Sequence, residues 1–293
     1  MKPRIATIIL NRNMPESTDA LVEFLQQRNN GETDIYVVES GSDRERLSRH
    51  YSFWANWEEA TREGLRWPRG FNYGLAELLK AGKFFSYDYF FLVCNDTIFL
   101  DNPIPPLMDE MDAHPRVGIL SPCAENWQER SLIGESGTAY VWHINHVAWM
   151  VRRSFVETVM EREQPGPLSF LYDGTNFRGY GADLELIVKG YINEHATALT
   201  TKALIRENTD ILRYKADLMR TDSFTVNQRR VFEEGQDWMR RKYGFTTWVH
   251  MHTYASMFYD RFFHLYPQYR RHRLPSVTDR IMTALELQEA ELC

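Results

Sequence analysis

Three carboxylates stand where predicted strands and helices of the chain begin or end. Asp96 follows the apolar run FFLVC at residues 90–94, Glu39 lies at the end of DIYVVES at residues 34–40, and Asp183 begins a helical pattern. Carboxylate oxygens bind hard divalent cations such as Mg2+ and Mn2+, and a carboxylate can also accept a proton during a reaction. The sequence therefore predicts metal or acid-base chemistry if the fold brings these positions together.

The segments that carry these carboxylates alternate between strand and helix patterns. Strands are predicted at residues 4–10, 34–40 and 87–93, because continuous apolar runs are typical of strands that are covered on both faces. Helices are predicted from Pro15 to about residue 30 and over residues 71–82. This alternation predicts an α/β fold with a mostly parallel sheet flanked by helices, in which ligands bind at the carboxyl ends of the strands.

The later part of the chain has weaker patterns. Residues 117–122 predict a strand, residues 139–155 predict strand-like material broken by polar residues, and SLIGESGTAY (131–140) predicts a loop long enough to act as a lid. A helix is expected between Asp183 and Gly190. The pattern from Phe232 onward is helical and rich in aromatic residues, and Ser276 with Asp279 resembles a capping box. We expect a first domain over residues 1–230 and a helical extension over residues 231–293.

The order of four stretches resembles the inverting glycosyltransferases of family 2, which have the GT-A nucleotide-sugar fold. TIILNRN (7–13) is similar to the first strand of that family, and YVVESGSDRE (36–45) is similar to its VVDNGSxD segment. GFNYGLAELL (70–79), followed by YDYFFLVCNDT (87–97), resembles the helix and strand that lead to the DxD motif. VRRSF (151–155) with GYGADLELIVKGY (179–191) resembles the arginine-rich strand and the helix start written ED. The resemblance covers about residues 4 to 200.

The resemblance implies transfer of a sugar from a nucleotide-sugar donor to a glycan or lipid-linked acceptor, with inversion at the anomeric carbon. Asp183 is the implied general base, and Asp96 is the implied ligand of Mg2+ or Mn2+, which would neutralise the departing diphosphate. Cys94 stands in place of the first aspartate of DxD, and Ala182 stands in place of the glutamate of ED. A thiol suits Mg2+ poorly, so Cys94 leaves the requirement for a metal open, while Ala182 leaves Asp183 as the single candidate of this motif for the base.

The family also suggests residues that contact the donor. Glu39 matches the acid that hydrogen-bonds the base or ribose, and Asn11, Arg12 and Asn72 match less discriminating donor-binding positions.

Each of these assignments has a structural alternative. Asp96 is also a typical turn residue, Glu39 a typical solvated end of a strand, and Asp183 a favoured N-cap of a helix. Asp173 and Glu185 are the fallback candidates for the base.

Two pairs of histidines are further candidates. His250 and His252, in WVHMHTY, are expected on one side of a strand, where the family often supplies a late histidine to the metal; packed or surface histidines are the alternative. His143 and His146 follow the expected lid, where they would contact an acceptor or form an aromatic wall.

Composition narrows the class of protein. The 293 residues are 43% hydrophobic and 25% charged, as in ordinary globular domains, and the net charge of −6 argues against nucleic acid as the main partner. The apolar stretch of MKPRIATIIL ends at Asn11 without a small-residue cleavage site, and no run has the length of a membrane span, so a cytoplasmic protein is expected. Three widely spaced cysteines suggest neither a disulfide framework nor a zinc ribbon.

The stretch FYDRFFHLYPQYRRHRLP (258–275) mixes aromatic residues with arginines. Such a mixture can contact the inner face of an anionic membrane, where a lipid-linked acceptor would lie, or form an interface in a homo-oligomer. Aromatic residues in the core with solvated arginines are the simpler interpretation.

Two other functions remain open at this point. A nucleotidyltransferase would share the sheet and the metal aspartate, but LNRNMPES after the first strand lacks the usual glycine-rich phosphate loop. A non-catalytic module that binds nucleotide sugars or glycans would account for Cys94 and Ala182 at motif positions.

Overall fold

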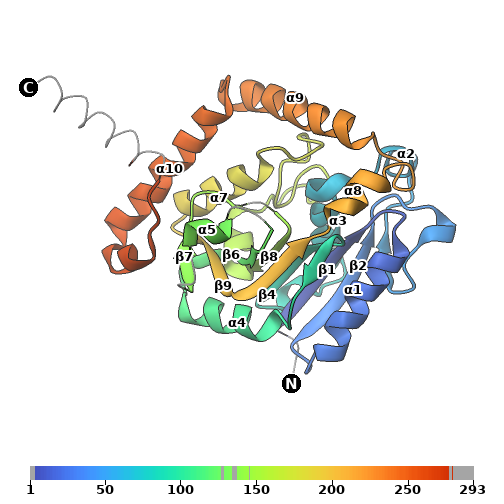
Figure 1. Ribbon diagram of the computed structural model, residues 1–293, viewed down its shortest axis with the longest axis horizontal. Coiled ribbons are helices and arrows are strands. Elements are labelled where there is room, and N and C mark those ends of the chain that lie inside the picture. The colour runs from blue at the N-terminus through green and yellow to red at the C-terminus, as the bar shows by residue number, and fades with distance from the viewer. Residues whose placement is uncertain (1–3, 127–128, 134–136, 145, 277–278, 280–293) are drawn as a thin grey trace, which may run out of the picture.

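The computed structural model describes residues 4–126, 129–133, 137–144, 146–276 and 279 (Figure 1). Its centre is a mixed sheet with the strand order β3-β2-β1-β4-β8-β6-β9-β5, and β7 pairs with β9. The strands are β1 (Ile5–Asn11), β2 (Thr33–Glu39), β3 (Tyr51–Trp54), β4 (Tyr89–Cys94), β5 (Thr97–Phe99), β6 (Val117–Ala124), β7 (Thr138–Tyr140), β8 (Ala148–Arg152) and β9 (Ala196–Glu207).

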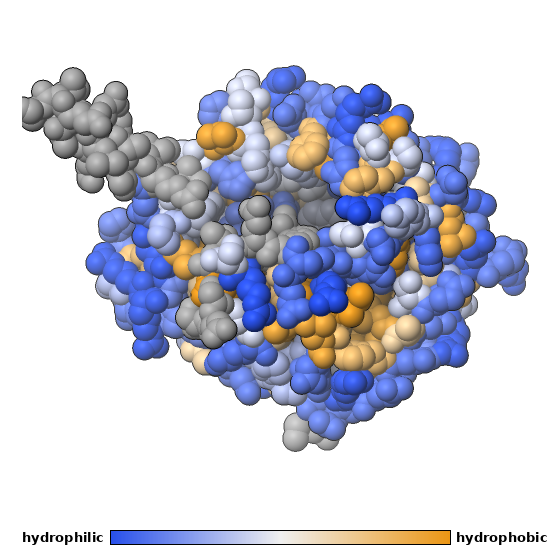
Figure 2. All heavy atoms as spheres, in the orientation of Figure 1, coloured by the Kyte–Doolittle hydropathy of each residue, from blue (hydrophilic) through white to orange (hydrophobic). Residues whose placement is uncertain are grey.

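Helices flank this sheet, as the sequence predicts for an α/β fold. They are α1 (Pro15–Arg28), α2 (Glu58–Glu63), α3 (Arg66–Lys80), α4 (Ile104–Ala113), α5 (Glu129–Ile133), α6 (Arg153–Val159), α7 (Ala182–Ile192), α8 (Thr209–Tyr214), α9 (Phe224–Tyr243) and α10 (Trp248–Leu265). Hydrophilic residues cover most of the face in Figure 2, and hydrophobic residues gather in an area below its centre. The α/β class with helices at the C-terminal end is confirmed.

The strands predicted from the first part of the sequence form the parallel half of the sheet. Every residue of β1 is buried, and β1 lies between β2 and β4 with both neighbours parallel to it. The register places Asn11 beside Glu39 and Leu10 beside Cys94. The carboxyl ends of these strands therefore meet at one edge of the sheet, as expected from the doubly wound pattern.

The other half of the sheet is mixed. Strand β8 is antiparallel to both β4 and β6, and β5 pairs with the end of β9 so that Thr97 lies opposite Glu207. Asp96 directly precedes Thr97, and its backbone carbonyl accepts a hydrogen bond from the Asn208 amide at 2.8 Å. This pairing brings Asp96 next to Glu207, although the two residues are far apart in the sequence.

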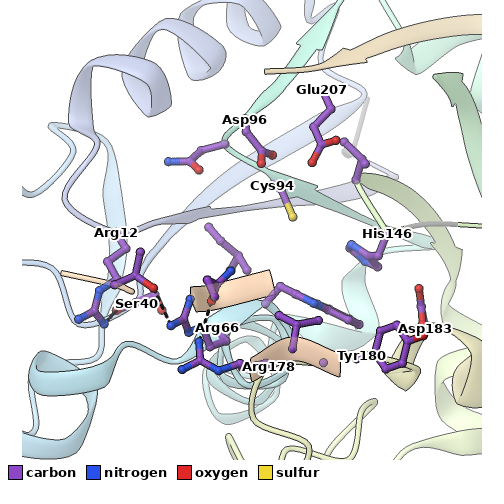
Figure 3. A pocket seen from close by; sticks show the side chains of 18 of the residues that line it. Arg12, Ser40, Arg66, Cys94, Asp96, His146, Arg178, Tyr180, Asp183 and Glu207 are labelled. Carbon is purple, nitrogen blue, oxygen red and sulfur yellow. Dashed lines mark hydrogen bonds between the residues drawn. The ribbon is translucent and has the colours of Figure 1, made fainter. Parts of the chain in front are cut away.

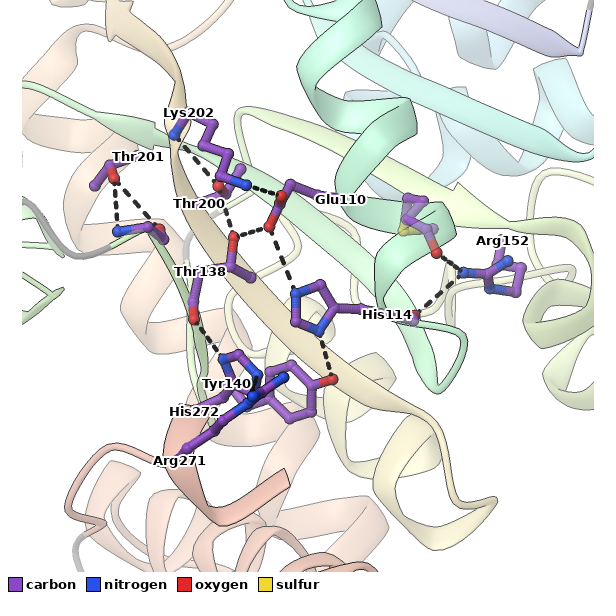
Figure 4. A network of polar contacts seen from close by, with 12 residues as sticks. Glu110, His114, Thr138, Tyr140, Arg152, Thr200, Thr201, Lys202, Arg271 and His272 are labelled. Carbon is purple, nitrogen blue, oxygen red and sulfur yellow. Dashed lines mark hydrogen bonds and ion pairs between the residues drawn. The ribbon is translucent and has the colours of Figure 1, made fainter. Parts of the chain in front are cut away.

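The expected lid at residues 131–140 is in part a strand of the sheet. Residues 134–136 lie outside the described residues, but Thr138 lies in β7, and its hydroxyl contacts Glu110 and Thr200 (Figure 4). Lys202 pairs with the same Glu110, and His272, in the 3-10 turn Pro267–His272, hydrogen-bonds the Thr138 carbonyl at 3.1 Å. This polar network holds β7 between α4 and the C-terminal segment.

The C-terminal helices pack on α7. Trp238 and Met239 of α9 and Met251 of α10 share a buried apolar cluster with Leu184 and Val188 of α7. Figure 1 shows α9 crossing the top of the molecule before α10 turns down beside α7. The division between residues 230 and 231 stays a prediction, and in the structure it falls inside α9.

Two sequence-based expectations for this region are corrected or refined. The strand expected at WVHMHTY is wrong, because these residues open α10, where apolar residues at helical spacing pack on α7. The aromatic residues Tyr259, Phe262 and Phe263 are core residues. Arg273 pairs with Asp260 and Asp279, and the capping box is confirmed by the hydrogen bonds between Ser276 and Asp279.

Among the described helices, none combines the length and apolar character that crossing a bilayer requires.

Gly41, which follows β2, tests how tightly the edge of the sheet is packed. Its φ is +77°, and a Cβ atom there would lie 1.7 Å from the Ala60 carbonyl oxygen. We expect Gly41→Ala to lower the free energy of unfolding by about 3 kcal/mol or more, since backbone strain and displacement of α2 add together. Urea denaturation measures the change.

Gly31→Ala is the matched control, because Gly31 also has a positive φ of +87° but open space around the Cβ position. Gly31→Ala should lower the free energy of unfolding by only about 1 kcal/mol. Equal losses for the two variants would show that the contact with α2 is unimportant.

Candidate active site

A pocket of about 460 Å³ opens at the carboxyl ends of β1 and β4 and beside the end of β9 (Figure 3). Its volume lies in the range typical of small-ligand sites. Asn11, Arg12, Asp96 and Asp183 line it, so the structure brings four of the sequence-predicted residues into one cavity. Segments before and within α9, and the first residue of α10, complete the wall.

One side of the pocket carries two neighbouring carboxylates, Asp96 and Glu207 (Figure 3). Burial, and then the nearby charge of Glu207, raise the pKa of Asp96 to about 7. The Oδ1 atom of Asp96 is buried without a hydrogen-bond partner. Two repelling carboxylates with a free oxygen form a donor set that suits a hard divalent cation.

The described side chains supply only some of the ligands that the expected divalent cation would need. No cluster of three histidine, cysteine, aspartate or glutamate side chains suited to a metal occurs in the described part of the chain. The Cys94 thiol lies beside Asp96, and burial, followed by the charges of Asp96 and Glu207, raises its pKa well above the usual value. Asp96 and Glu207 therefore fit an ion such as Mg2+ or Mn2+ that takes its other ligands from phosphate oxygens and water.

A second side of the pocket carries three arginines, Arg12, Arg66 and Arg178 (Figure 3). Burial, followed by the charges of Arg178 and Arg12, lowers the pKa of Arg66 to about 10. Burial, followed by the charge of Arg220, lowers the pKa of Arg12 to about 10 as well. Neither Arg12 nor Arg66 has an ion pair with a carboxylate among the described residues. The Arg12 guanidinium donates to five backbone carbonyl groups, whereas the Nε atom of Arg66 is buried without a partner. This arrangement favours a bound anion.

The arginines are held by the chain segment that leads into α9. Arg12 donates to the Met219 carbonyl at 2.7 Å, and Arg66 donates to the Thr221 hydroxyl at 2.7 Å. Arg178 is buried and pairs with Asp222 at 2.8 Å and with Glu234 at 2.9 Å. The positions of the guanidinium groups therefore depend on residues near the expected C-terminal extension.

Asp183 lies at another side of the pocket, apart from the arginines (Figure 3). It is the second residue of α7, while Gly181 in the left-handed conformation occupies the N-cap position, so the expectation that Asp183 caps the helix is corrected. Its Oδ1 atom accepts a hydrogen bond from the Leu184 amide at 2.8 Å. Burial raises the pKa of Asp183 to about 7, which leaves a proton acceptor that titrates near neutral pH.

Glu39 and Asn72 do not line the pocket. Glu39 is fully buried and accepts hydrogen bonds from the Asn11 amide, the Ser42 hydroxyl and the Ser48 backbone N–H. Burial raises its pKa, and these hydrogen bonds reduce the shift. Glu39 is therefore not a solvated strand end, and in this structure it positions the loop after β2 instead of facing a ligand.

Asn72 has a comparable structural role. Its amide donates to the Pro167 and Tyr172 carbonyls and accepts from the Leu171 and Tyr172 amides, at 2.8 to 3.1 Å. These four hydrogen bonds occupy the side chain and anchor residues 167–172 to α3.

The fallback bases are engaged elsewhere. Lys242 of α9 pairs with Asp173 at 2.6 Å and with Glu185 at 2.7 Å. Burial opposes ionisation of Asp173, but hydrogen bonds from Lys242, Thr175 and Trp238 outweigh it and lower the pKa. His250 is exposed, whereas His252 packs against His143 with ring centroids 4.8 Å apart.

Sequence reasoning missed Arg66, Arg178 and Glu207. Arg66 opens α3 upstream of the predicted helix start, and Arg178 lies in the irregular stretch FRGYG; neither stretch carries a periodic pattern in the sequence. Glu207 ends a strand that the sequence does not predict. The one available signal was the sequence Arg178-Gly179-Tyr180-Gly181, which immediately precedes the expected base.

The comparisons with known proteins show similarity in structure only. No family model matches the chain, and no curated protein matches it. Among solved structures, the chain is similar to GalNAc-T7 with UDP, GalNAc and Mn2+, at 10% identity and a TM-score of 0.49, over 83% of this chain and 58% of that chain. This chain thus spans less than two thirds of GalNAc-T7.

In two other similar structures, the match with this chain covers a larger share of the other protein. The mannosyltransferase PcManGT from Pyrobaculum calidifontis, in complex with GDP-Man and Mn2+, has 10% identity and a TM-score of 0.48, over 99% of this chain and 81% of that one. Glucosyl-3-phosphoglycerate synthase from Mycobacterium tuberculosis, with Mn2+, UDP and glucosyl-3-phosphoglycerate, has 12% identity and a TM-score of 0.45, over 82% and 80%. Because the similarity is so low, the evidence for the function of this chain has to come from its own residues.

The raised pKa of Asp183 predicts a pH-dependent effect on stability. A carboxyl group with a folded-state pKa near 7 and an ordinary value of 3.8 stabilises the fold below pH 4 and loses that contribution as the pH rises to 7. We expect Asp183→Asn to be more stable than the wild type by roughly 1 to 3 kcal/mol at pH 8 and nearly equal at pH 4. Urea denaturation at both pH values measures this.

Asp173→Asn is the control of opposite sign. Its carboxylate has a lowered pKa, so its contribution is present at pH 8 and is lost at acid pH. The variant should be destabilised at pH 8. An Asp183→Asn variant that loses stability at pH 8 would contradict the burial of an ionisable carboxyl at this position.

Proposed function

We propose that this protein is a GT-A glycosyltransferase that moves a sugar from a nucleotide-sugar donor to the hydroxyl group of an acceptor, with inversion at the anomeric carbon. The observation that supports it is the placement of an arginine cluster and a proton acceptor at separate sides of one pocket, with a carboxylate pair on a third side (Figure 3). Displacement of a diphosphate by a hydroxyl group is favoured by positive charge at the leaving group and a proton acceptor on the opposite side, and a divalent cation adds further charge stabilisation.

The arginine side suits the diphosphate of the donor. Arg66 presents a cationic group whose Nε atom has no hydrogen-bond partner, whereas the Arg12 guanidinium donates to five backbone carbonyl groups and contributes its charge. Arg178 is fixed beside them by its ion pairs. A planar guanidinium matches phosphate oxygens in charge and geometry. Leu10, Asn11 and Ser40 at the strand ends line the adjoining part of the pocket, where the nucleoside would lie.

Asp96 and Glu207 would hold the divalent cation, Mg2+ or Mn2+, against the phosphate oxygens. The bound cation would supply charge neutralisation for the departing diphosphate. Binding would also offset the burial and the repulsion from Glu207 that together raise the pKa of Asp96.

Asp183 performs the proton transfer in this proposal. Its carboxylate takes the proton of the acceptor hydroxyl as the acceptor oxygen bonds to the anomeric carbon and the bond from that carbon to the diphosphate oxygen breaks. The attack comes from the side opposite the leaving group, so a single step inverts the configuration. A pKa near 7 suits a base that works at neutral pH.

The acceptor in this proposal is a glycan or a lipid-linked acceptor. A non-catalytic module for nucleotide sugars is the second candidate, because Cys94 and Ala182 replace two motif acids. Such a module would use the same arginines and would bind the donor without turnover.

Activity assays with Asp183→Asn test the catalytic proposal. A thermal-shift screen with UDP, dTDP, GDP and CMP sugars, with and without Mn2+, first identifies the donor, since a ligand of the folded state raises Tm. Asp183→Asn should lower kcat about 100-fold or more while donor affinity stays nearly unchanged. Asp237→Asn, at an exposed position in α9, is the control. Donor binding by the wild type without any turnover would instead support the binding module.

Arg66→Met tests the role of the arginine cluster. Loss of one charge-assisted contact to phosphate should weaken binding of the matching nucleoside diphosphate roughly 10- to 100-fold, as measured by isothermal titration calorimetry. Arg62→Met, in which an exposed arginine is replaced, should bind like the wild type. If both variants bind the nucleoside diphosphate equally well, the diphosphate does not lie against Arg66.

A further inference from the structure

The Asp183 side of the pocket has an aromatic wall that comes from two parts of the chain. Tyr180 precedes α7, and Trp248 is the first residue of α10. Their rings stack with centroids 4.5 Å apart and planes 28° apart, and both residues line the pocket together with Asp183. The C-terminal helices therefore contribute directly to the side that holds the proposed base.

Contacts behind the wall fix the Tyr180 ring. Gly235 of α9 lies so close that a Cβ atom there would be 2.4 Å from Tyr180 Cδ1, and the Phe232 ring meets Tyr180 edge to face with centroids 4.8 Å apart. Asn176 donates a hydrogen bond to the Tyr180 carbonyl at 2.9 Å. A ring held in this way presents a preformed surface to a ligand, so little side-chain freedom is lost on binding.

The histidines on this side add polar atoms without adding charge. Burial lowers the pKa of His146 to about 3, and burial followed by His252 lowers the pKa of His143 to about 4, so both rings are neutral at pH 7. Both ring nitrogens of His146 are buried without a hydrogen-bond partner. A neutral imidazole donates one hydrogen bond and accepts another, which suits a hydroxyl group.

Charge divides the pocket into two unlike ends. The cationic residues among its described lining residues are Arg12, Arg66 and Arg178, and Figure 3 places the labelled arginines away from Asp183. A phosphate or carboxylate on the acceptor would therefore meet Asp183 and neutral rings instead of a cation. Placing an unpaired anion beside another carboxylate is unfavourable.

We propose that the acceptor is a neutral sugar whose ring lies against Trp248 and Tyr180, with one hydroxyl directed to Asp183. A sugar ring has a face of C–H groups that packs on an aromatic ring and a rim of hydroxyl groups that need hydrogen-bond partners. The aromatic wall can pack against the C–H face of the sugar, and His146 and Asp183 can hydrogen-bond its hydroxyl groups. This inference rests on the proposed function and specifies the acceptor class for the same site.

Two acceptor panels test the acceptor class. Methyl glycosides of neutral hexoses are compared with the corresponding hexose 6-phosphates, and transfer is measured with the donor found by thermal shift. We expect kcat/KM for the neutral glycosides to exceed that for the phosphates at least 10-fold. A preference for the phosphorylated sugars would overturn the proposal.

Substitution of Trp248 tests the position of the acceptor. Trp248→Ala should raise the KM for the neutral acceptor roughly 10-fold, with a much smaller effect on the KM for the donor, which binds at the other end of the pocket. Trp248→Phe keeps an aromatic ring and should restore most of the acceptor affinity, which also excludes misfolding as the cause. Trp57→Ala, at an exposed tryptophan, is the matched control. An unchanged acceptor KM in Trp248→Ala would refute the placement.

Direct binding separates this inference from the proposed function. Saturation-transfer NMR measures binding of the methyl glycosides to the wild type and to Trp248→Ala without any turnover. Loss of the saturation-transfer signal in Trp248→Ala supports the acceptor site even if no donor is turned over, whereas absence of signal in the wild type rejects it even if the protein proves to be a transferase.

Discussion

The buried hydrogen bonds between Asn11 and Glu39 hold together the edge of the sheet on which the pocket is built. The two residues lie side by side at the ends of β1 and β2, and Glu39 also accepts hydrogen bonds from Ser42 and from the Ser48 amide. A buried carboxylate is tolerated only when it is well hydrogen-bonded, so these contacts specify how the chain leaves both strands. Arg12 and Ser40, which line the pocket, follow directly from these two positions.

A second constraint is the separation of charge around the cavity. Antiparallel pairing of β5 with β9 creates the carboxylate pair, whereas the first residue of α3 and the loop before α7 supply Arg66 and Arg178. The charged form of each group is disfavoured by burial and by a neighbouring like charge, as the raised pKa of Asp96 and the lowered pKa of Arg66 indicate. Sites that bind and transform charged ligands commonly retain such local strain in the unliganded protein.

The sequence predicted what depends on local pattern. Apolar runs located the central strands and the edge where they end, and both Asp96 and Asp183 reached the same pocket. It could not predict Glu207 as a neighbour of Asp96, because that contact depends on the pairing of distant strands. Glu39 and Asn72 were found as important polar residues, but their hydrogen bonds are internal. The alternating histidines of WVHMHTY match the two-residue period of a strand, so the sequence predicts a strand there. In the structure this segment forms a helix, because its apolar residues pack on α7.

The stacking of Trp248 on Tyr180 also bears on how the protein would tolerate partial unfolding. The proposed donor side of the pocket is formed mainly by strands of the large core, whereas the side with the proposed base includes the Trp248 ring of the peripheral helix α10. Transient detachment of that helix would leave a cavity able to retain nucleotide but open to water beside Asp183. If the proposed transfer reaction is correct, heating or mild denaturant would allow hydrolysis of the bound donor before the whole protein unfolds.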